Sequence, residues 1–191
     1  MMAAPVDDPL KSDSRSDQEL IAAINDGHAD AFEALYYRYR DWVVGLAYRF
    51  TGDRELALDV LQETFLYVVR KFPGFRLTAQ IKTFLYPAVR NLSIAAQRKA
   101  QRLQSNENET GTIEEVITTE PTVSQSESLT AALALLSAEH REVLLLRFVD
   151  GLSLAEIAET LGIPLGTVKS RLHNALAFLR HDPRTKEYFE R

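Results

Sequence analysis

The chain has 191 residues, 46% of them hydrophobic, no cysteine and a net charge of −5. This size and composition suit one ordinary domain or two small helical ones, and they argue against disorder throughout. The lack of cysteine excludes disulfides, thiolate metal sites and a cysteine nucleophile, and it is compatible with a reducing cytosol. Residues 1–17 are polar and acidic, and no stretch approaches the roughly 18 apolar residues that a membrane span requires. We therefore expect a cytoplasmic protein without membrane insertion.

The charges are strongly segregated along the chain. Residues 1–63 carry 6 basic and 13 acidic side chains, whereas residues 64–106 carry 8 basic side chains and no acidic one. Residues 107–128 then hold 6 acids and no base, and residues 129–191 hold 8 of each. Such blocks indicate separate electrostatic roles, although a basic run taken alone is also typical of a solvated helix face.

Two helices are predicted first in the chain. Ser16 and Glu19 have the spacing of a capping box and open a short helix, whose apolar residues recur at helical intervals until Gly27. Apolar residues then follow one another at three- and four-residue intervals over residues 30–50, which predicts a second and longer helix. Residues 1–15, which precede the capping box, are expected to be disordered.

A third and a fourth helix complete the predicted N-terminal domain. Asp53 can cap the third helix, whose apolar stripe ends before Pro73. The fourth covers about residues 80–103, and Pro87 within it removes a backbone donor and predicts a kink or a late start. The sequence thus predicts a four-helix domain over residues 16–104.

Residues 105–128 are polar and acidic, and apart from the short sequence IEEVI nothing in them repeats at helical or strand period. This composition is typical of a flexible linker. Helical patterns resume over residues 129–181, which leaves residues 182–191 as a short tail. Because no segment shows persuasive two-residue alternation, we predict an all-α fold of two small helical domains joined by a flexible acidic linker.

The second domain contains the layout of a helix-turn-helix. Ser153 and Glu156 form a second capping box, which opens a short helix. Gly162 permits the turn, and the next helix begins after Pro164. Small apolar residues on the first helix, such as Ala155, allow the second helix to cross close to it.

The second helix of this motif has a small and basic N-terminal half. Val168 and Leu172 are expected to anchor it, which leaves its other side chains near the surface where a DNA major groove would lie. The candidate minus-35 DNA-binding residues are Leu165, Gly166, Thr167, Lys169, Ser170, Arg171 and His173. An ordinary helical hairpin with a few exposed bases is the alternative. No carboxylate or cysteine lies at ligand spacing from His173 or His181, so we expect no metal and no cofactor.

The chain closely resembles the extracytoplasmic-function (ECF) sigma factors of bacterial RNA polymerase. The resemblance covers about residues 16–104 and 129–181 and rests, in this order, on DAFEALYYRYRDWVVGLAYRFTGDRELALDVLQETFLYVVRKFPGFR, on KTFLYPAVRNLSIAAQRKAQR and on the helix-turn-helix with GTVKSRL. It implies that the N-terminal domain is sigma region 2, which holds the polymerase and opens the promoter. It also implies that the C-terminal domain is region 4, which reads the minus-35 element. The implied function is promoter-specific initiation of transcription, without enzymatic activity.

The resemblance also implies roles for individual residues of region 2. Four positions match the surface that docks on the clamp helices of the polymerase β′ subunit: Asp59, Gln62, Glu63 and Thr64. Eight positions match the segment that captures the unstacked minus-10 strand: Phe75, Arg76, Gln80, Lys82, Thr83, Phe84, Tyr86 and Arg90. Binding of single-stranded DNA requires basic side chains interleaved with aromatic rings. The three aromatic rings of this set could equally be buried in the core.

The partners that the resemblance implies are promoter DNA and core RNA polymerase, through its β′ clamp helices and its β flap, with an anti-sigma factor as a further candidate. The acidic linker is similar to the connector that in this family threads toward the RNA exit path. The chain also departs from the family pattern. Many relatives have Trp and Arg where Phe84 and Pro87 stand, and arginines commonly follow GTVKSRL where this chain has His173, Asn174 and Ala175.

Two other classes of protein compete with this interpretation. A two-component response regulator can carry a similar helix-turn-helix, but it needs an α/β receiver domain where this sequence predicts four helices. A nucleic-acid hydrolase could use the carboxylates of Asp53, Glu55, Asp59 and Glu63. No base, glycine-rich phosphate loop or metal constellation accompanies these carboxylates in the sequence, which argues against a hydrolase.

Overall fold

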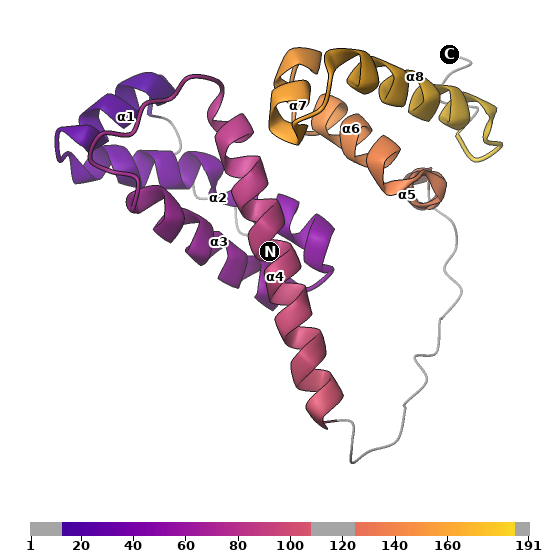
Figure 1. Ribbon diagram of the computed structural model, residues 1–191, viewed down its shortest axis with the longest axis horizontal. Coiled ribbons are helices and arrows are strands. Elements are labelled where there is room, and N and C mark those ends of the chain that lie inside the picture. Colours follow the sequence, from indigo (N-terminus) through magenta and orange to yellow (C-terminus); the bar gives the residue numbers. More distant parts are fainter. Residues whose placement is uncertain (1–12, 108–124, 186–191) are drawn as a thin grey trace, which may run out of the picture. The chain divides into compact units, whose positions relative to one another are not determined.

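The computed structural model describes residues 13–107 and 125–185 (Figure 1). Every regular element of these residues is an α-helix, which confirms the predicted all-α class. The chain divides into two compact units, residues 1–112 and residues 113–191. The N-terminal unit holds α1 (Asp17–Asn25), α2 (Ala29–Thr51), α3 (Arg54–Val69) and α4 (Ile81–Glu107), and the C-terminal unit holds α5 (Gln125–Leu135), α6 (Ala138–Phe148), α7 (Leu154–Leu161) and α8 (Leu165–His181).

Local capping signals define the helix ends of the N-terminal unit. The Ser16 hydroxyl accepts a hydrogen bond from the Glu19 backbone N–H at 3.3 Å, and the Glu19 carboxylate accepts one from the Ser16 N–H at 2.6 Å. The Asp53 carboxylate likewise accepts from the Glu55 N–H at 2.7 Å at the start of α3. Gly52 ends α2 with a φ of 67°, a left-handed conformation that favours glycine. These groups satisfy part of the backbone that a helix end leaves unpaired.

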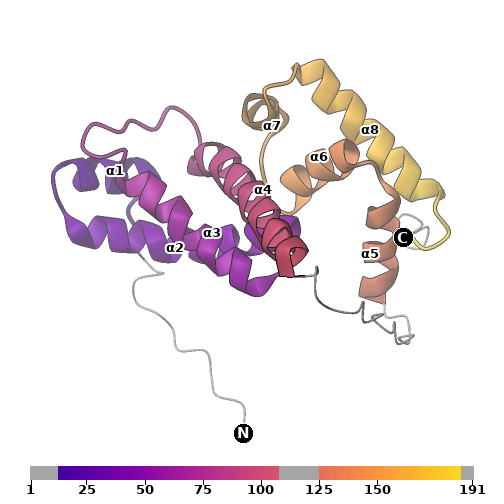
Figure 2. The ribbon, with the colours of Figure 1, turned by 60° about the horizontal axis from the view of Figure 1, so that its bottom comes forward.

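The core of the N-terminal unit lies where α4 packs against both α2 and α3, an arrangement that Figure 2 shows from a second side. Its largest fully buried side chains are Leu20, Leu35, Val43, Val60, Val68, Ile81, Leu85 and Val89. Burying one such side chain stabilises the fold by about 1.5–3 kcal/mol. Helix α4 begins at Ile81 and continues through Pro87, so the proline does not delay the helix.

The chain ahead of α1 is bonded to the N-terminal unit from Asp13 onward. Arg38 donates hydrogen bonds to the backbone carbonyls of Asp13 and Arg15 at 2.7 and 2.8 Å, and its guanidinium pairs with Asp17 at 2.7 Å. The adjacent Arg15 guanidinium lowers the pKa of the Asp13 carboxyl to about 2. Residues 13–15 are therefore held in place within the segment expected to be disordered, and the rest of that segment lies outside the described residues.

Both ends of the segment predicted as a linker are helical. Helix α4 extends to Glu107, and α5 already begins at Gln125. Residues 108–124, with the sequence IEEVI, lie outside the described residues.

The C-terminal unit is built around α8, against which both α6 and α7 pack (Figure 2). One cluster of buried side chains joins α5 and α6 to the second half of α8, and it consists of Ala132, Leu136, Leu144, Ala175 and Leu179. Arg141 donates hydrogen bonds to the carbonyls of Leu133, Ala134 and Leu136 and so satisfies the end of α5. In the described part of the chain, no helix is both long and apolar enough to cross a membrane.

Candidate nucleic-acid interface

The predicted helix-turn-helix is present as α7, a turn and α8. The Ser153 hydroxyl accepts from the Glu156 N–H at 3.3 Å, and the Glu156 carboxylate accepts from the Ser153 N–H at 2.7 Å, so the second capping box also forms. Gly162 makes the turn in the left-handed conformation, with a φ of 64°. Ile157 of α7 and Val168 of α8 are fully buried. These two side chains fix how α8 lies on α7.

The N-terminal half of α8 presents a small, polar and basic surface. The exposed members of the predicted minus-35 set are Leu165, Gly166, Lys169, Ser170 and His173. Thr167 is half-buried, and its backbone carbonyl accepts a hydrogen bond from the Ser170 hydroxyl at 3.0 Å. Leu165 is the one large apolar side chain among these exposed residues.

Arg171 differs from the other residues of the predicted set. Its guanidinium lies 2.6 Å from the Glu139 carboxylate of α6, and its side chain is 21% exposed. The ion pair joins the middle of α8 to the first turn of α6. Arg171 therefore has a role within the C-terminal unit that its place in the sequence did not reveal.

The acidic face predicted to dock on the polymerase lines a groove between α3 and α4. Asp59, Gln62 and Glu63 are exposed, and together with apolar residues of both helices they border a cavity of about 470 Å³. Lys99 of α4 lies on the opposite wall. Thr64 is fully buried and its hydroxyl makes no hydrogen bond, so its side chain faces the core and cannot belong to this face.

Aromatic rings gather where the loop after α3 meets the start of α4. Phe84 stacks on Tyr67 of α3, with ring centres 5.8 Å apart and planes 20° from parallel. Phe75 also packs against Phe84, with ring centres 4.6 Å apart, and Phe72 lies 5.5 Å from Phe75. Lys71 places its ammonium 4.7 Å from the centre of the Tyr67 ring. We call Tyr67, Phe72, Phe75 and Phe84 the aromatic cluster.

The loop that carries Phe75 is held by one side chain of α1. The Asn25 amide donates to the Phe75 carbonyl at 2.9 Å and accepts from the Gly74 N–H at 2.6 Å. Both hydrogen bonds join residues about fifty positions apart in the chain. No local pattern in the sequence pointed to Asn25, and none pointed to Tyr67, whose ring is 37% exposed.

The other residues predicted to capture the minus-10 strand fall into two groups. Arg76, Gln80 and Arg90 are exposed, and Lys82 is half-buried with its ammonium 5.7 Å from the centre of the Trp42 ring. Thr83 and Tyr86 are buried, at 7% and 2% exposure, and Tyr86 packs edge-on against Phe50. Because successive helical positions point in different directions, Thr83 and Tyr86 face the core while Phe84 does not.

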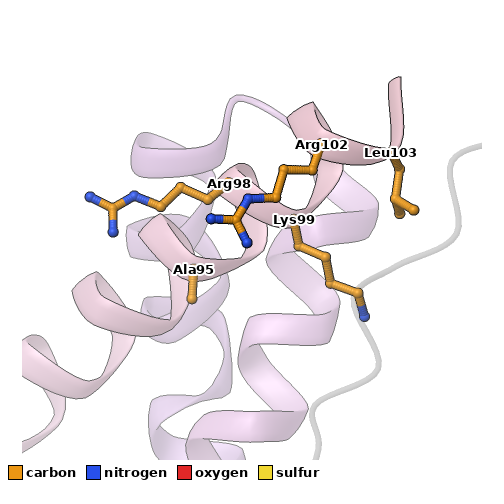
Figure 3. Close-up of a pocket in the computed structure, with 5 residues that line it drawn as sticks. All are labelled: Ala95, Arg98, Lys99, Arg102 and Leu103. Carbon is orange, nitrogen blue, oxygen red and sulfur yellow. The ribbon is translucent and has the colours of Figure 1, made fainter. Parts of the chain in front are cut away.

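The second half of α4 carries exposed basic residues. Figure 3 shows Arg98 and Arg102 extending to the same side of the helix, one turn apart, whereas Lys99 points away from them. The three side chains are exposed. They supply much of the positive charge that the sequence concentrates in residues 64–106.

Exposed apolar side chains mark a further surface on the C-terminal unit. Phe148 and Val149, at the end of α6, are 61% and 63% exposed. The two neighbours leave apolar side-chain surface exposed to water at the end of α6. No group of three His, Cys, Asp or Glu side chains that could hold a metal ion occurs in residues 13–107 and 125–185.

Comparison with protein families and with curated sequences identifies the two units. The family model "Sigma-70 region 2" matches residues 35–103, and "Sigma-70, region 4" matches residues 126–179. The ECF RNA polymerase sigma factor SigL of Mycobacterium tuberculosis is 38% identical over 165 residues, which cover 84% of this chain and 87% of SigL. The ECF RNA polymerase sigma factor SigW of Bacillus subtilis is 31% identical and covers 84% of this chain and 92% of its own length.

Solved structures show the same fold. CnrH, solved in complex with the cytosolic domain of CnrY, is similar with a TM-score of 0.61 and 23% identity, over 85% of this chain and 93% of that one. The sigma factor RpoE of Bartonella quintana, solved with the anti-sigma factor NepR, gives a TM-score of 0.57 at 23% identity, over 78% and 94%. Residues 13–107 form four helices and not the α/β receiver domain that the response-regulator interpretation needs there. The chain therefore belongs to the ECF sigma factors, non-enzymatic subunits that direct RNA polymerase to initiate transcription at specific promoters.

Proposed function

We propose that the N-terminal half of α8 reads the minus-35 element in the major groove, while the N-terminal unit docks on core polymerase and captures the minus-10 strand. The observation that carries the first part is the burial of Val168 beneath an exposed Lys169, Ser170 and His173. A side chain buried at one helix position fixes which neighbours face outward. This half of α8 therefore turns these three side chains outward together, as direct readout of base edges requires.

Lys169 is the best candidate for a specific contact in this surface. It is exposed, and a lysine can donate to the two major-groove acceptors of guanine. Losing a contact of this kind lowers the discrimination between the correct and the wrong base by about 1–3 kcal/mol. Arg180, exposed in the last turn of the same helix, offers a control with the same charge at the other end of α8.

The test uses holoenzyme reconstituted from core polymerase and the full chain. A promoter library randomised over the minus-35 region is selected for binding, and the enriched sequences are read. We expect Lys169→Ala to relax the preference at one or two positions and Arg180→Ala to leave it unchanged. An unaltered motif with Lys169→Ala would refute the placement of this residue in the groove.

The groove between α3 and α4 is proposed as the docking site for the β′ clamp helices. Its exposed Asp59, Gln62 and Glu63 can pair with basic and polar groups of a helical partner. The apolar residues that also line the groove can bury apolar side chains of that partner. Thr64 takes no part in this proposal because its side chain is buried.

Binding of core polymerase tests the groove directly. Asp59→Asn and Glu63→Gln should each weaken the complex several-fold and reduce its salt dependence. Glu33→Gln is the matched control, because Glu33 is an exposed carboxylate of α2 outside the groove. Equal affinities for all three variants would exclude a role for the acidic face in docking.

The aromatic cluster is proposed as the site that holds an unstacked base of the minus-10 strand. Phe75 and Phe84 are half-buried, so each retains exposed surface, and Arg76, Gln80 and Arg90 are exposed on the same loop and on α4. Stacking of a base on such a ring contributes about 1–3 kcal/mol. Thr83 and Tyr86 are left out of the proposed contact surface, because both are buried.

Strand capture can be followed with holoenzyme and a promoter that carries a fluorescent base analogue in the minus-10 element. We expect Phe84→Leu to lower the fluorescence change on melting, because the leucine preserves apolar volume but removes the stacking face. Tyr48→Leu is the control, since Tyr48 is an exposed ring of α2 outside the aromatic cluster. An unchanged fluorescence signal from Phe84→Leu would show that the unstacked base binds elsewhere than on the Phe84 ring.

Two further partners follow from the surfaces of the chain. The exposed Phe148 and Val149 suit an apolar contact with the polymerase β flap. An anti-sigma factor, the kind of partner with which RpoE of Bartonella quintana was solved, would have to cover the groove or the aromatic cluster to block initiation. We place this activity in the cytoplasm, where core polymerase and promoter DNA are found.

A further inference from the structure

One side chain of α1 holds the loop between α3 and α4. Figure 1 shows this loop, residues 70–80, passing beside α1. The Asn25 amide nitrogen donates to the Phe75 carbonyl at 2.9 Å, and the amide oxygen accepts from the Gly74 N–H at 2.6 Å. The backbone of residues 73–79 forms hydrogen bonds with Asn25 and with no other described residue. The polar anchor of this part of the loop is therefore a single amide.

Helix stability does not account for Asn25 at the end of α1. Asparagine is a weak helix former, and where it does end a helix it takes the left-handed conformation just beyond the last turn. Here Gly27 takes that conformation, with a φ of 88°, and the Asp26 N–H bonds to the Ala22 carbonyl at 3.1 Å. Both hydrogen bonds of the Asn25 side chain go to the loop. The amide thus serves the loop rather than its own helix.

The backbone that Asn25 holds carries one ring of the aromatic cluster. Phe75 packs against Phe84 with ring centres 4.6 Å apart, so its ring contacts α4 while its carbonyl is bonded to α1. Gly74 precedes it with a φ of 99°, in a region that glycine enters without strain. A glycine has many conformations to choose from, so the position of Phe75 depends on the bonds that fix its backbone. Asn25 provides these bonds.

We propose that Asn25 is a positioning residue for base capture. It holds Gly74 and Phe75 in the conformation in which the aromatic cluster receives the unstacked base, and it acts through the loop rather than by touching DNA. This inference rests on the proposed role of the aromatic cluster in capturing the minus-10 strand. Without Asn25 the loop would populate other conformations, and the affinity for the base would fall with the fraction of molecules that remain competent.

The place of Asn25 in the fold predicts which step of initiation depends on it. The minus-35 element is proposed to bind α8, and the β′ clamp helices the groove between α3 and α4, and Asn25 belongs to neither site. Binding of core polymerase and of the closed, fully paired promoter should therefore not require Asn25. The later step, in which the minus-10 strand separates and one base enters the aromatic cluster, should require it.

The experiment uses holoenzyme reconstituted with the unchanged full chain or with Asn25→Ala, Asn25→Asp or Gln18→Ala. Asn25→Ala removes both hydrogen bonds, whereas Asn25→Asp keeps an oxygen that can accept from the Gly74 N–H. Gln18→Ala is the control, because Gln18 is an exposed amide in the first turn of α1. Affinity for the closed promoter is measured at low temperature. Base capture is measured with a fluorescent base analogue in the minus-10 element, on duplex promoter and on a forked template whose minus-10 strand is already unpaired.

We expect Asn25→Ala to lower the equilibrium constant for base capture by about two- to twelvefold for each hydrogen bond lost. The loss should be the same on the duplex and on the forked template, because it concerns the captured base and not the separation of the strands. Asn25→Asp should fall between the unchanged chain and Asn25→Ala. All four proteins should bind core polymerase and the closed promoter alike, and Gln18→Ala should capture the base normally.

Three results would overturn the inference. The first is normal base capture by Asn25→Ala, and the second is a loss confined to the duplex promoter. The third is a weakening of core binding by Asn25→Ala in proportion to the loss of capture, which would show a general structural role. Phe84→Leu in the same assay separates these results from failure of the proposed capture site. A reduced signal from Phe84→Leu beside a normal one from Asn25→Ala would refute the positioning role alone, whereas an unchanged signal from Phe84→Leu would refute capture on the Phe84 ring itself.

Discussion

The ion pair between Arg171 and Glu139 makes a prediction that separates two roles for one arginine. The sequence alone places Arg171 among the residues that contact DNA, and on that view Arg171→Ala would leave folding intact. In the structure the guanidinium is bound 2.6 Å from Glu139 and joins α8 to α6. We therefore expect Arg171→Ala to lower the stability of the C-terminal unit as well as promoter recognition.

The magnitude follows from the exposure of the two side chains. Glu139 is 66% exposed and Arg171 is 21% exposed, so water screens one end of the pair and not the other. Exposed ion pairs contribute about 0.2–1 kcal/mol, and this pair belongs in the upper half of that range. A double-mutant cycle of Arg171→Ala and Glu139→Gln should give a coupling of about 0.5–1 kcal/mol, which is about a two- to fivefold change in the folding equilibrium.

Glu139→Gln supplies the decisive comparison, because it removes the ion pair but keeps the guanidinium. Chemical denaturation measures the stability of each variant, and transcription with reconstituted holoenzyme measures promoter recognition. If Arg171 acts by positioning α8, Glu139→Gln should reduce both quantities in the same direction as Arg171→Ala. Full or increased transcription with Glu139→Gln, beside abolished transcription with Arg171→Ala, would refute the positioning role and restore Arg171 as a direct DNA contact.

Three further predictions concern the folded state. Thr64→Val should raise the free energy of unfolding by about 1 kcal/mol, because it removes a buried hydroxyl that makes no hydrogen bond, and a lower melting temperature would show that the hydroxyl is satisfied. Ile157→Ala should destabilise the C-terminal unit by about 2–5 kcal/mol through the cavity it leaves, and a cost below about 1 kcal/mol in chemical denaturation would contradict tight packing of α7 on α8. Because Arg15 lowers the folded-state pKa of Asp13 to about 2, their bond should be intact above about pH 4 and lost as the pH falls toward 2, which NMR titration of the carboxyl can follow with Asp13→Asn as control.

Signals that depend on a few neighbouring residues predicted the helix ends well. Both capping boxes form as expected, Asp53 caps α3, and Gly52 and Gly162 end their helices in the left-handed conformation. These are local effects, since a cap satisfies backbone groups within one turn of itself. The all-α class followed from the same local patterns.

Burial around Phe84 could not be predicted in the same way. Phe84, Thr83 and Tyr86 are close in sequence, yet the first retains exposed ring surface and the other two face the core. The difference depends on the rotation of α4 against α2 and α3, which no run of neighbouring residues encodes. Tyr67 joins the aromatic cluster for the same reason, because it is brought to Phe84 by the packing of two helices.

The ion pair of Arg171 illustrates a second limit. Glu139 is thirty-two residues away in the sequence, and an exposed basic residue next to Lys169 has the same local pattern whether it binds DNA or another helix. The predicted bounds of the linker differ from the helix ends because Glu107 and Gln125 are polar end residues of helices whose apolar residues lie further inside α4 and α5. Polar composition does not by itself end a helix.

The Asn25 side chain has a consequence for the energetics of promoter melting. Asn25 is the last residue of α1, a nine-residue helix, and helices of this length are only marginally stable in isolation. Its side-chain nitrogen and oxygen each form one hydrogen bond to the loop that carries Phe75. The shape of the loop is therefore linked to the integrity of α1, so that fraying of this helix and disorder of the loop must occur together. Under the proposed role of the aromatic cluster, a protein that bound α1 would change the order of the Phe75 loop, and with it the entropy lost when a base is captured.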